Sequence, residues 1–318
     1  MQIHPRPEGL RTEFCDAATQ TCIHTSRESR PTEVHNPQRP ESPWGRQDRR
    51  TSPIGSSPSS PARSGIGLEL AREFASRDFD LIVAAENIAI FAAARELESS
   101  KASVEPVQVD FATPAGVEEL YARIEADGRP LSAAVLNAGV GTRGDFATGT
   151  ALETELLIID LNVRWIVHLA KRVVSDMVKR VQGRILVTSS VAANEPGAFQ
   201  AIYNASKSFV QAFSLALRDE LDDTGVTVTT LMPGPTDTPF FQRASIPDSH
   251  VATLRMADPA AVARAGFAAL MDGDRLVVTT LPPPAVPLSK RFRIRIGRVL
   301  PRRLKAVLRN KMARLDSA

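Results

Sequence analysis

Apolar runs alternate with helical periodicity from Ser64 to about Thr280. Short runs rich in Val, Ile, Leu and Ala predict strands at residues 81–85, 104–110, 131–139, 183–190, 226–234 and 275–280. Apolar residues three and four apart predict helices at residues 66–76, 88–99, 114–127, 152–180, 200–223 and 259–271. Strands that alternate with helices form βαβ units around a parallel sheet. The pattern therefore predicts an α/β fold, a doubly wound parallel sheet in a single domain of residues 64–280.

The first 63 residues lack this pattern. They hold nine of the 23 prolines but only six residues of the types Val, Ile, Leu and Phe. Such a composition cannot bury enough apolar surface to offset the entropy lost on ordering. We therefore expect residues 1–63 to be a disordered or aberrant N-terminal segment. We expect residues 281–318 to form a proline-rich turn followed by a basic amphipathic tail.

Charge is distributed unevenly along the chain. The net charge is +3, but residues 290–318 carry eleven Lys and Arg against the single acid Asp316. The tail is therefore at +10 and the rest of the chain at −7, which makes nucleic-acid binding by the body unexpected, because that needs clustered cations. Only the tail leaves open a contact with nucleic acid or, peripherally, with an anionic membrane. We see no long apolar run or signal segment and expect a cytoplasmic protein. The two cysteines, Cys15 and Cys22, are too few for a zinc site.

A glycine pair opens the first predicted helix of the domain. Gly65, Ile66 and Gly67 follow Ser64, and Glu86 lies 19 residues beyond Gly67, at the end of a strand. Glycines at a helix start let the backbone approach a pyrophosphate, and a carboxylate at about that distance binds the adenosine ribose. Simple helix capping explains the glycine pair equally well.

A second group of residues points to proton transfer. Tyr203 and Lys207 lie four residues apart on one helical face, where an ammonium lowers the pKa of a phenol toward working pH. A phenol so tuned exchanges a proton with a substrate oxygen. Ser190 ends the strand at 183–190, at the carboxyl edge where open α/β sheets bind ligands. The other tyrosine, Tyr121, has Glu125 rather than a lysine at this offset.

Together these motifs resemble the short-chain dehydrogenase/reductase family, NAD(P)-dependent oxidoreductases built on a single Rossmann domain. The resemblance covers about Ser64 to Thr280 and includes further motif residues in family order: Asp110, Asn137, Ala138, Gly139, Asn162, Pro233, Gly234 and Thr236. It implies hydride transfer between a nicotinamide cofactor and an alcohol or carbonyl substrate.

The resemblance also implies a role for each motif residue. Tyr203 would be the acid/base, Lys207 would lower its pKa and bind the nicotinamide ribose, and Ser190 would donate to the substrate oxygen. Asn162 would hold a proton-relay water, and Asp110 would meet the adenine. The remaining positions would line the cofactor cleft: Gly65, Ile66, Gly67, Glu86, Asn137, Ala138, Gly139, Pro233, Gly234 and Thr236. The substrate would be set by segments 141–150, 191–202 and 236–258, which no motif decodes.

The cofactor is expected to be NAD or NADP. Glu86 favours NAD, because its carboxylate would repel the 2′-phosphate of NADP. Arg63, near the phosphate loop, favours NADP instead.

The chain departs from the family at its first strand, which is missing or replaced. Counting back from Gly65, the family's Thr-Gly pair falls on Ser60-Pro61, and residues 51–60 are too polar for a buried central strand. Proline also fixes φ near −65° and blocks the phosphate turn. Our hypothesis is that residues 1–63 are an out-of-frame translation fused to a dehydrogenase body.

Other functions remain open at this point. One alternative is an inactive or unstable relative with an incomplete cofactor site, and another is a scaffold whose basic tail binds an anionic membrane or nucleic acid. His168 is interpreted as a packed or interface histidine, since no metal partner lies near it in sequence. Its helix is apolar around most of its circumference, which fits a core or a subunit interface. The resemblance favours a homodimer or homotetramer.

Overall fold

The computed structural model describes residues 21–25, 65–98, 102–244 and 255–280. The strands are β1 (Thr21–Thr25), β2 (Asp80–Ala85), β3 (Val104–Gln108), β4 (Leu131–Leu136), β5 (Gly183–Thr188), β6 (Val226–Pro233) and β7 (Leu276–Thr279). The α-helices are α2 (Ile66–Ala75), α3 (Ile90–Leu97), α4 (Pro114–Asp127), α5 (Leu152–Ile159), α6 (Trp165–Lys179), α7 (Ala201–Glu220), α8 (Phe240–Arg243) and α10 (Pro259–Asp272). A π-helical turn, η3 (Asp160–Arg164), separates α5 from α6, and a 3-10 turn, η4 (Val191–Asn194), follows β5.

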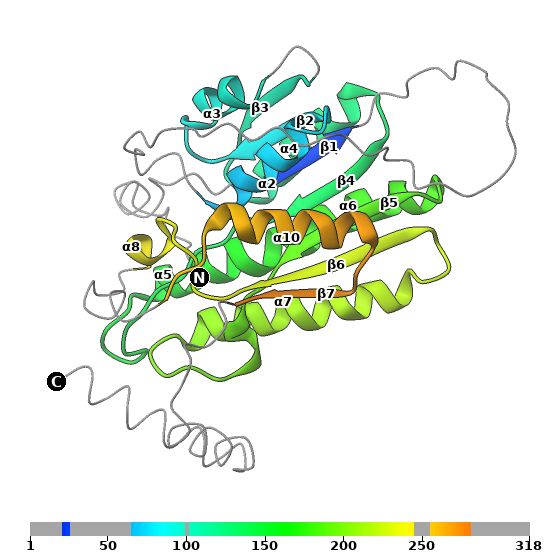
Figure 1. Ribbon diagram of the computed structural model, residues 1–318. Coiled ribbons are helices and arrows are strands. Elements are labelled where there is room, and N and C mark those ends of the chain that lie inside the picture. Colours follow the sequence, from blue (N-terminus) through cyan, green and yellow to red (C-terminus); the bar gives the residue numbers. More distant parts are fainter. Residues whose placement is uncertain (1–20, 26–64, 99–101, 245–254, 281–318) are drawn as a thin grey trace, which may run out of the picture.

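The strands form one sheet in the order β3-β2-β1-β4-β5-β6-β7 (Figure 1). The pairs β2–β3, β4–β5, β5–β6 and β6–β7 are parallel, as the alternating pattern predicted. The Rossmann-like α/β class is confirmed. The long predicted helix at 152–180 is interrupted by the π-turn, which periodicity alone did not indicate.

The centre of the sheet corrects the prediction for the N-terminal segment. The strand β1 comes from within residues 1–63 and pairs with both β2 and β4, with Ile23 opposite Ile82 on one side and Ala134 on the other. The segment TCIHT contains β-branched Thr and Ile, which favour strands, but it is too short to stand out from its polar surroundings. The family's first strand is thus replaced, and the predictions for residues 1–20 and 26–63, including Pro61, lie outside the described residues.

The replacement strand runs antiparallel to its neighbours. Thr21 lies opposite Ala84 near the carboxyl end of β2, and Thr25 lies opposite Asp80 at its amino end. The strand therefore ends at the edge of the sheet opposite to the one where parallel β2 and β4 end. It does not lead directly into α2, as a parallel first strand would.

Two apolar clusters, one on each face of the sheet, make up the core. Alternate residues of β2 belong to different clusters: Ile82 packs with α4, α6 and α7, whereas Leu81 and Val83 pack with α2, α3 and α10. Figure 1 shows α2 and α10 lying side by side over one face of the sheet. Because helices cover both faces, most strand residues are buried regardless of which face they point to.

Candidate active site

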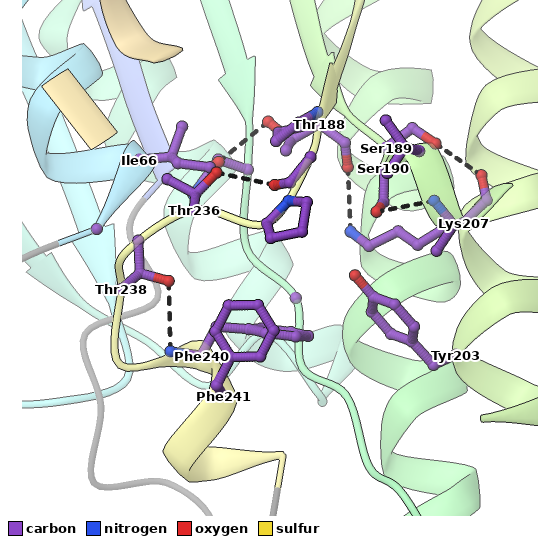
Figure 2. Close-up of a pocket in the computed structure, with 18 of the residues that line it drawn as sticks. Ile66, Thr188, Ser189, Ser190, Tyr203, Lys207, Thr236, Thr238, Phe240 and Phe241 are labelled. Atoms are coloured by element: carbon purple, nitrogen blue, oxygen red, sulfur yellow. Dashed lines mark hydrogen bonds between the residues drawn. The ribbon is translucent and has the colours of Figure 1, made fainter. Parts of the chain in front are cut away.

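A cavity of about 330 Å³ lies at the carboxyl edge of the sheet, between the start of α2, the ends of β4, β5 and β6, and α7 (Figure 2). Predicted residues in its wall are Gly65, Ile66, Gly67, Asn137, Gly139, Ser190, Tyr203, Lys207, Pro233, Gly234 and Thr236. Segments far apart in sequence thus converge where open α/β sheets bind ligands.

Tyr203 and Lys207 lie on one face of α7, and both side chains are buried. Figure 2 shows the Tyr203 hydroxyl pointing toward the end of the Lys207 side chain. Burial raises the pKa of Tyr203 to about 12, although a hydrogen bond with Ser190 lowers it in part. The prediction that Lys207 brings this pKa down toward working pH is wrong for this structure, because the effect of burial is larger and Lys207 contributes no lowering. At neutral pH the phenol is protonated and is a proton donor.

Lys207 is held by backbone groups at the end of β5. Its Nζ donates to the carbonyl oxygen of Thr188 at 3.1 Å, and its own carbonyl accepts from the Ser189 hydroxyl at 2.8 Å. Burial lowers the pKa of Lys207 to about 8, because the charged form loses its hydration. These contacts join α7 to β5 and fix where the ammonium sits in the cavity wall.

Ser190 caps the 3-10 turn that follows β5. Its hydroxyl accepts from the backbone N–H of Ala192 at 3.2 Å, and its hydrogen bond with Tyr203 lowers the pKa of that phenol. A serine at a strand end, with extended φ and ψ, caps such a turn readily. The turn therefore carries Ser190 to the side of the cavity where Tyr203 lies.

Asn162 is fully buried behind the cavity, within the π-turn. Its amide bonds to both backbone groups of Val140, at 2.8 Å each, and donates to the Ser206 hydroxyl at 2.9 Å. A Cβ at Gly139 would lie 2.8 Å from Asn162 Oδ1 and 3.2 Å from Lys207 Nζ. Asn162 does not line the cavity; it fixes the loop after β4, and its predicted water-holding role remains a prediction. A π-turn is itself a frequent feature of functional sites.

Three predicted cofactor residues lie outside the cavity wall. Ala138 is buried, and Glu86 follows β2, where its carbonyl accepts from the side chain of Gln108 at 3.0 Å. The Asp110 carboxylate accepts from the backbone N–H of Ala112 at 2.8 Å and closes the turn before α4. Glu86, Asp110 and Ala138 are therefore not part of the cavity wall, and their roles stay predictions.

Each end of the cavity has a feature that suits one end of an extended dinucleotide. At one end the first turn of α2 begins at Gly65, and the backbone N–H groups of a first turn have no partner within their own helix and bind phosphate. At the other end Gly139 leaves a space next to Lys207 that any side chain would fill. The residues present thus fit a nicotinamide dinucleotide.

Sequence motifs missed several residues of the cavity wall. They are Arg143, Thr188, Ser189, Val191, Ala192, Gln200, Thr238, Phe240 and Phe241. Phe240 packs against the ring of Tyr203 at a centroid distance of 5.4 Å, and Phe241 meets Phe240 edge to face at 5.6 Å. Seven of these nine fall within the segments 141–150, 191–202 and 236–258 that were predicted to set the substrate, whereas Thr188 ends β5 and Ser189 follows it. The segments could be located from sequence, but the inward-pointing residues could not.

His168 and Tyr121, for which no catalytic role was predicted, bond to side chains of neighbouring helices. His168 Nε2 lies 2.5 Å from a carboxylate oxygen of Glu118, which also bonds to Arg172. Tyr121 donates to Asp176 at 2.6 Å, which raises the pKa of the phenol and joins α4 to α6.

Within the described ranges no group of three or more His, Cys, Asp or Glu side chains is placed to hold a metal ion. None of the helices in that same part of the chain is long and apolar enough to cross a membrane.

Comparison with known proteins agrees with this geometry. Residues 61–248 match the family described as short chain dehydrogenase. The chain is 31% identical over 173 residues to the NADP-dependent 3-hydroxy acid dehydrogenase YdfG of Salmonella typhi, a match covering 54% of this chain and 69% of that protein. It is 34% identical over 174 residues to an uncharacterized oxidoreductase of Myxococcus xanthus, covering 54% of this chain and 68% of that one.

Solved structures give the same result. A short-chain dehydrogenase from Sphingobium yanoikuyae in complex with NADPH superposes with a TM-score of 0.64 and 29% identity, covering 74% of this chain and 90% of that one. The L-sorbose reductase of Gluconobacter frateurii complexed with NADPH and L-sorbose has a TM-score of 0.61 and 25% identity, covering 68% and 91%. This chain belongs to the short-chain dehydrogenase/reductase family of oxidoreductases, whose members act on CH–OH and C=O groups.

Proposed function

We propose that this chain is an NAD(P)-dependent oxidoreductase that transfers a hydride between the nicotinamide and an alcohol or carbonyl substrate, with Tyr203 as the acid/base. The observation that carries the proposal is the burial of Tyr203 and Lys207 together in the cavity wall, with Ser190 hydrogen-bonded to the phenol. An exposed helix pair would have no such surroundings.

The roles of the residues follow from this geometry. A bound nicotinamide dinucleotide supplies the hydride to the carbonyl carbon in reduction and accepts it in oxidation. Tyr203 gives its phenol proton to the substrate oxygen in reduction, and Ser190 donates a hydrogen bond to the same oxygen. Lys207, fixed by Thr188, holds the nicotinamide ribose. Because the pKa of Tyr203 is about 12, the protonated phenol dominates at neutral pH, and this is the form that donates a proton in carbonyl reduction.

The choice between NAD and NADP rests on Glu86. Its carboxylate follows β2, and a negative charge there disfavours the 2′-phosphate of NADP. The relatives do not support the predicted preference for NAD, since YdfG is named NADP-dependent and two similar structures hold NADPH. Our proposal is therefore NAD(P) without a stated preference, and binding titrations with NADH and NADPH measure the preference directly.

The Tyr203→Phe variant tests the proposal. It removes the phenol proton alone, so we expect loss of carbonyl reduction with nearly unchanged binding of NADPH, measured by cofactor fluorescence. The matched control is Tyr121→Phe, because Tyr121 lies away from the cavity and bonds to Asp176. This control should keep its turnover and lose about 1 kcal/mol of stability. Full turnover by Tyr203→Phe would refute the role of Tyr203.

A second candidate, an inactive relative, is favoured by one observation. The strand β1 runs antiparallel and ends at Thr25, opposite Asp80, so it does not deliver the chain to the phosphate loop before α2. Weak dinucleotide binding by the otherwise folded chain would support this candidate. The scaffold alternative depends on the basic tail, which lies outside the described residues.

We also propose that the chain forms a homodimer or homotetramer. The helix α5 exposes Leu152, Leu156 and Ile159 in one stripe, and Phe209 is exposed on α7, which packs beside α5. Apolar residues at this spacing on a helix surface are typical of a buried interface. Light scattering measures the molar mass in solution, and a monomer would contradict this proposal.

A further inference from the structure

The cavity wall carries positive charge without a compensating carboxylate. Its described residues include two cations, Arg143 and Lys207, and no Asp or Glu. Lys207 is bonded to Thr188, as described above. Arg143 stacks over the ring of Phe199, with 5.7 Å between its Cζ and the ring centroid, and no carboxylate of the described residues lies within ion-pair distance of it. A half-buried guanidinium in this position presents donors to whatever enters the cavity.

The contacts of its loop place Arg143 at the Tyr203 end of the cavity. A Cβ on Gly141 would lie 3.2 Å from Cδ2 of Tyr203, so the loop runs directly against the phenol ring. Gly144 donates its backbone N–H to the carbonyl of Phe199 at 2.9 Å. Phe199 lies just before α7, four residues ahead of Tyr203 in the sequence. The loop that carries Arg143 therefore lies beside Tyr203.

Phe199 adopts a backbone conformation that is unusual for its type. Its φ is +64°, in the left-handed region that bulky residues rarely enter. Such a conformation persists only where the surrounding contacts hold it, and it occurs most often at functional sites. Here it allows Phe199 to place its ring under Arg143 while its carbonyl bonds to Gly144. The Phe199 ring contacts the guanidinium and the Phe199 carbonyl bonds to the loop at Gly144, and these two contacts restrict the movement of Arg143.

We propose that Arg143 binds a carboxylate of the substrate, so that the substrate is an oxo acid or hydroxy acid rather than a neutral ketone or alcohol. This inference rests on the function proposed above. The planar guanidinium donates two parallel hydrogen bonds to a carboxylate, and no negative group in the described wall competes with the substrate. The rings of Phe240 and Phe241 belong to the apolar part of the wall and favour a substrate that also has a hydrocarbon segment.

The test compares acids with their uncharged esters. Pyruvate, acetoacetate and levulinate place the carboxylate at three distances from the carbonyl, and each is assayed beside its methyl ester with NADPH and with NADH. We expect kcat/KM to favour the acid by about 10- to 100-fold in at least one pair, since a hydrogen bond to a charged group has that effect. The difference should appear mainly in KM, because the contact is made in the ground state as well as in the transition state.

Variants of Arg143 assign that preference to the residue. Arg143→Gln should lose the preference for the acid, so its kcat/KM should fall at least about 10-fold more for the acid than for the ester, and Arg143→Lys should keep an intermediate preference because it retains charge but not the planar fork. Thermal unfolding with and without cofactor shows that both variants fold. If no pair favours the acid in the wild type, or if Arg143→Gln lowers acid and ester equally, the proposal is overturned.

A binding measurement separates this proposal from the proposed function. Calorimetry of levulinate with the wild type and with Arg143→Gln, in the presence and absence of NADP+, requires no turnover. Binding at least 10-fold tighter to the wild type supports carboxylate recognition even if no substrate is reduced, in which case the proposed oxidoreductase activity has failed alone. Equal or absent binding to both proteins, together with reduction of neutral ketones, overturns the recognition by Arg143 and leaves the activity standing.

Discussion

A proline in β1 tests whether the N-terminal strand holds the centre of the sheet. Ile23 lies opposite residues of both β2 and β4, so its backbone is part of a ladder on each side. Ile23→Pro removes one ladder hydrogen bond, worth about 1 kcal/mol, and leaves a facing carbonyl unpaired at a cost of about 1 to 3 kcal/mol. A loss of roughly 3 kcal/mol lowers the melting temperature of a domain of this size by about 6 to 12 °C.

The assay is thermal unfolding followed by circular dichroism, with and without NADPH. Ser29→Pro is the matched control, because it introduces the same residue outside the strand. Ile23→Pro should also weaken NADPH binding, because β1 separates β2 and β4, whose ends carry Glu86 and Asn137. If Ile23→Pro and Ser29→Pro unfold at the same temperature and bind NADPH equally, β1 does not form the central strand, and the reasoning is wrong.

Three further predictions concern the site. Burial lowers the pKa of Lys207 from 10.5 to about 8, so protonation of Lys207 destabilises the folded state below pH 8. The free energy of unfolding, measured with urea, should therefore rise by about 3 kcal/mol between pH 8 and 10.5 relative to Lys207→Met. The prediction is contradicted if the unfolding free energies of the wild type and Lys207→Met change equally with pH. Gly139→Ala would place a Cβ 2.8 Å from Asn162 Oδ1 and should cost about 1 to 3 kcal/mol of stability and lower kcat, whereas unchanged melting and turnover would show that the loop yields. Glu86→Arg should shift the ratio of the Kd values for NADH and NADPH toward NADPH by at least about 10-fold, and an unchanged ratio in fluorescence titrations would exclude Glu86 as the ribose contact.

The motif residues that converge on the cavity were predictable because each has a local signature. Tyr203 and Lys207 lie four residues apart and therefore share one face of α7, and Ser190 lies two residues beyond the end of β5, whose apolar run is evident in the sequence. In a parallel sheet the strand ends meet at one edge, so a strand end in the sequence is already a position near the ligand. The position of Asn162 was marked by its motif, but its bonds to Val140 and Ser206 were not, since they form only when the helix opens into a π-turn.

The sequence by itself determined most of the strands and helices of residues 64–280 and the motif residues expected at the site, because periodicity and turn residues act locally. Tertiary structure alone decided three features: the use of Thr21–Thr25 as the central strand, the raised pKa of Tyr203, and the placement of Arg143 beside Phe199. A five-residue polar strand is selected by the two neighbours that would otherwise keep unpaired backbone groups, and not by its own propensity. The pKa of a phenol and the direction of a loop arginine likewise depend on what surrounds them, and those surroundings come from distant parts of the chain.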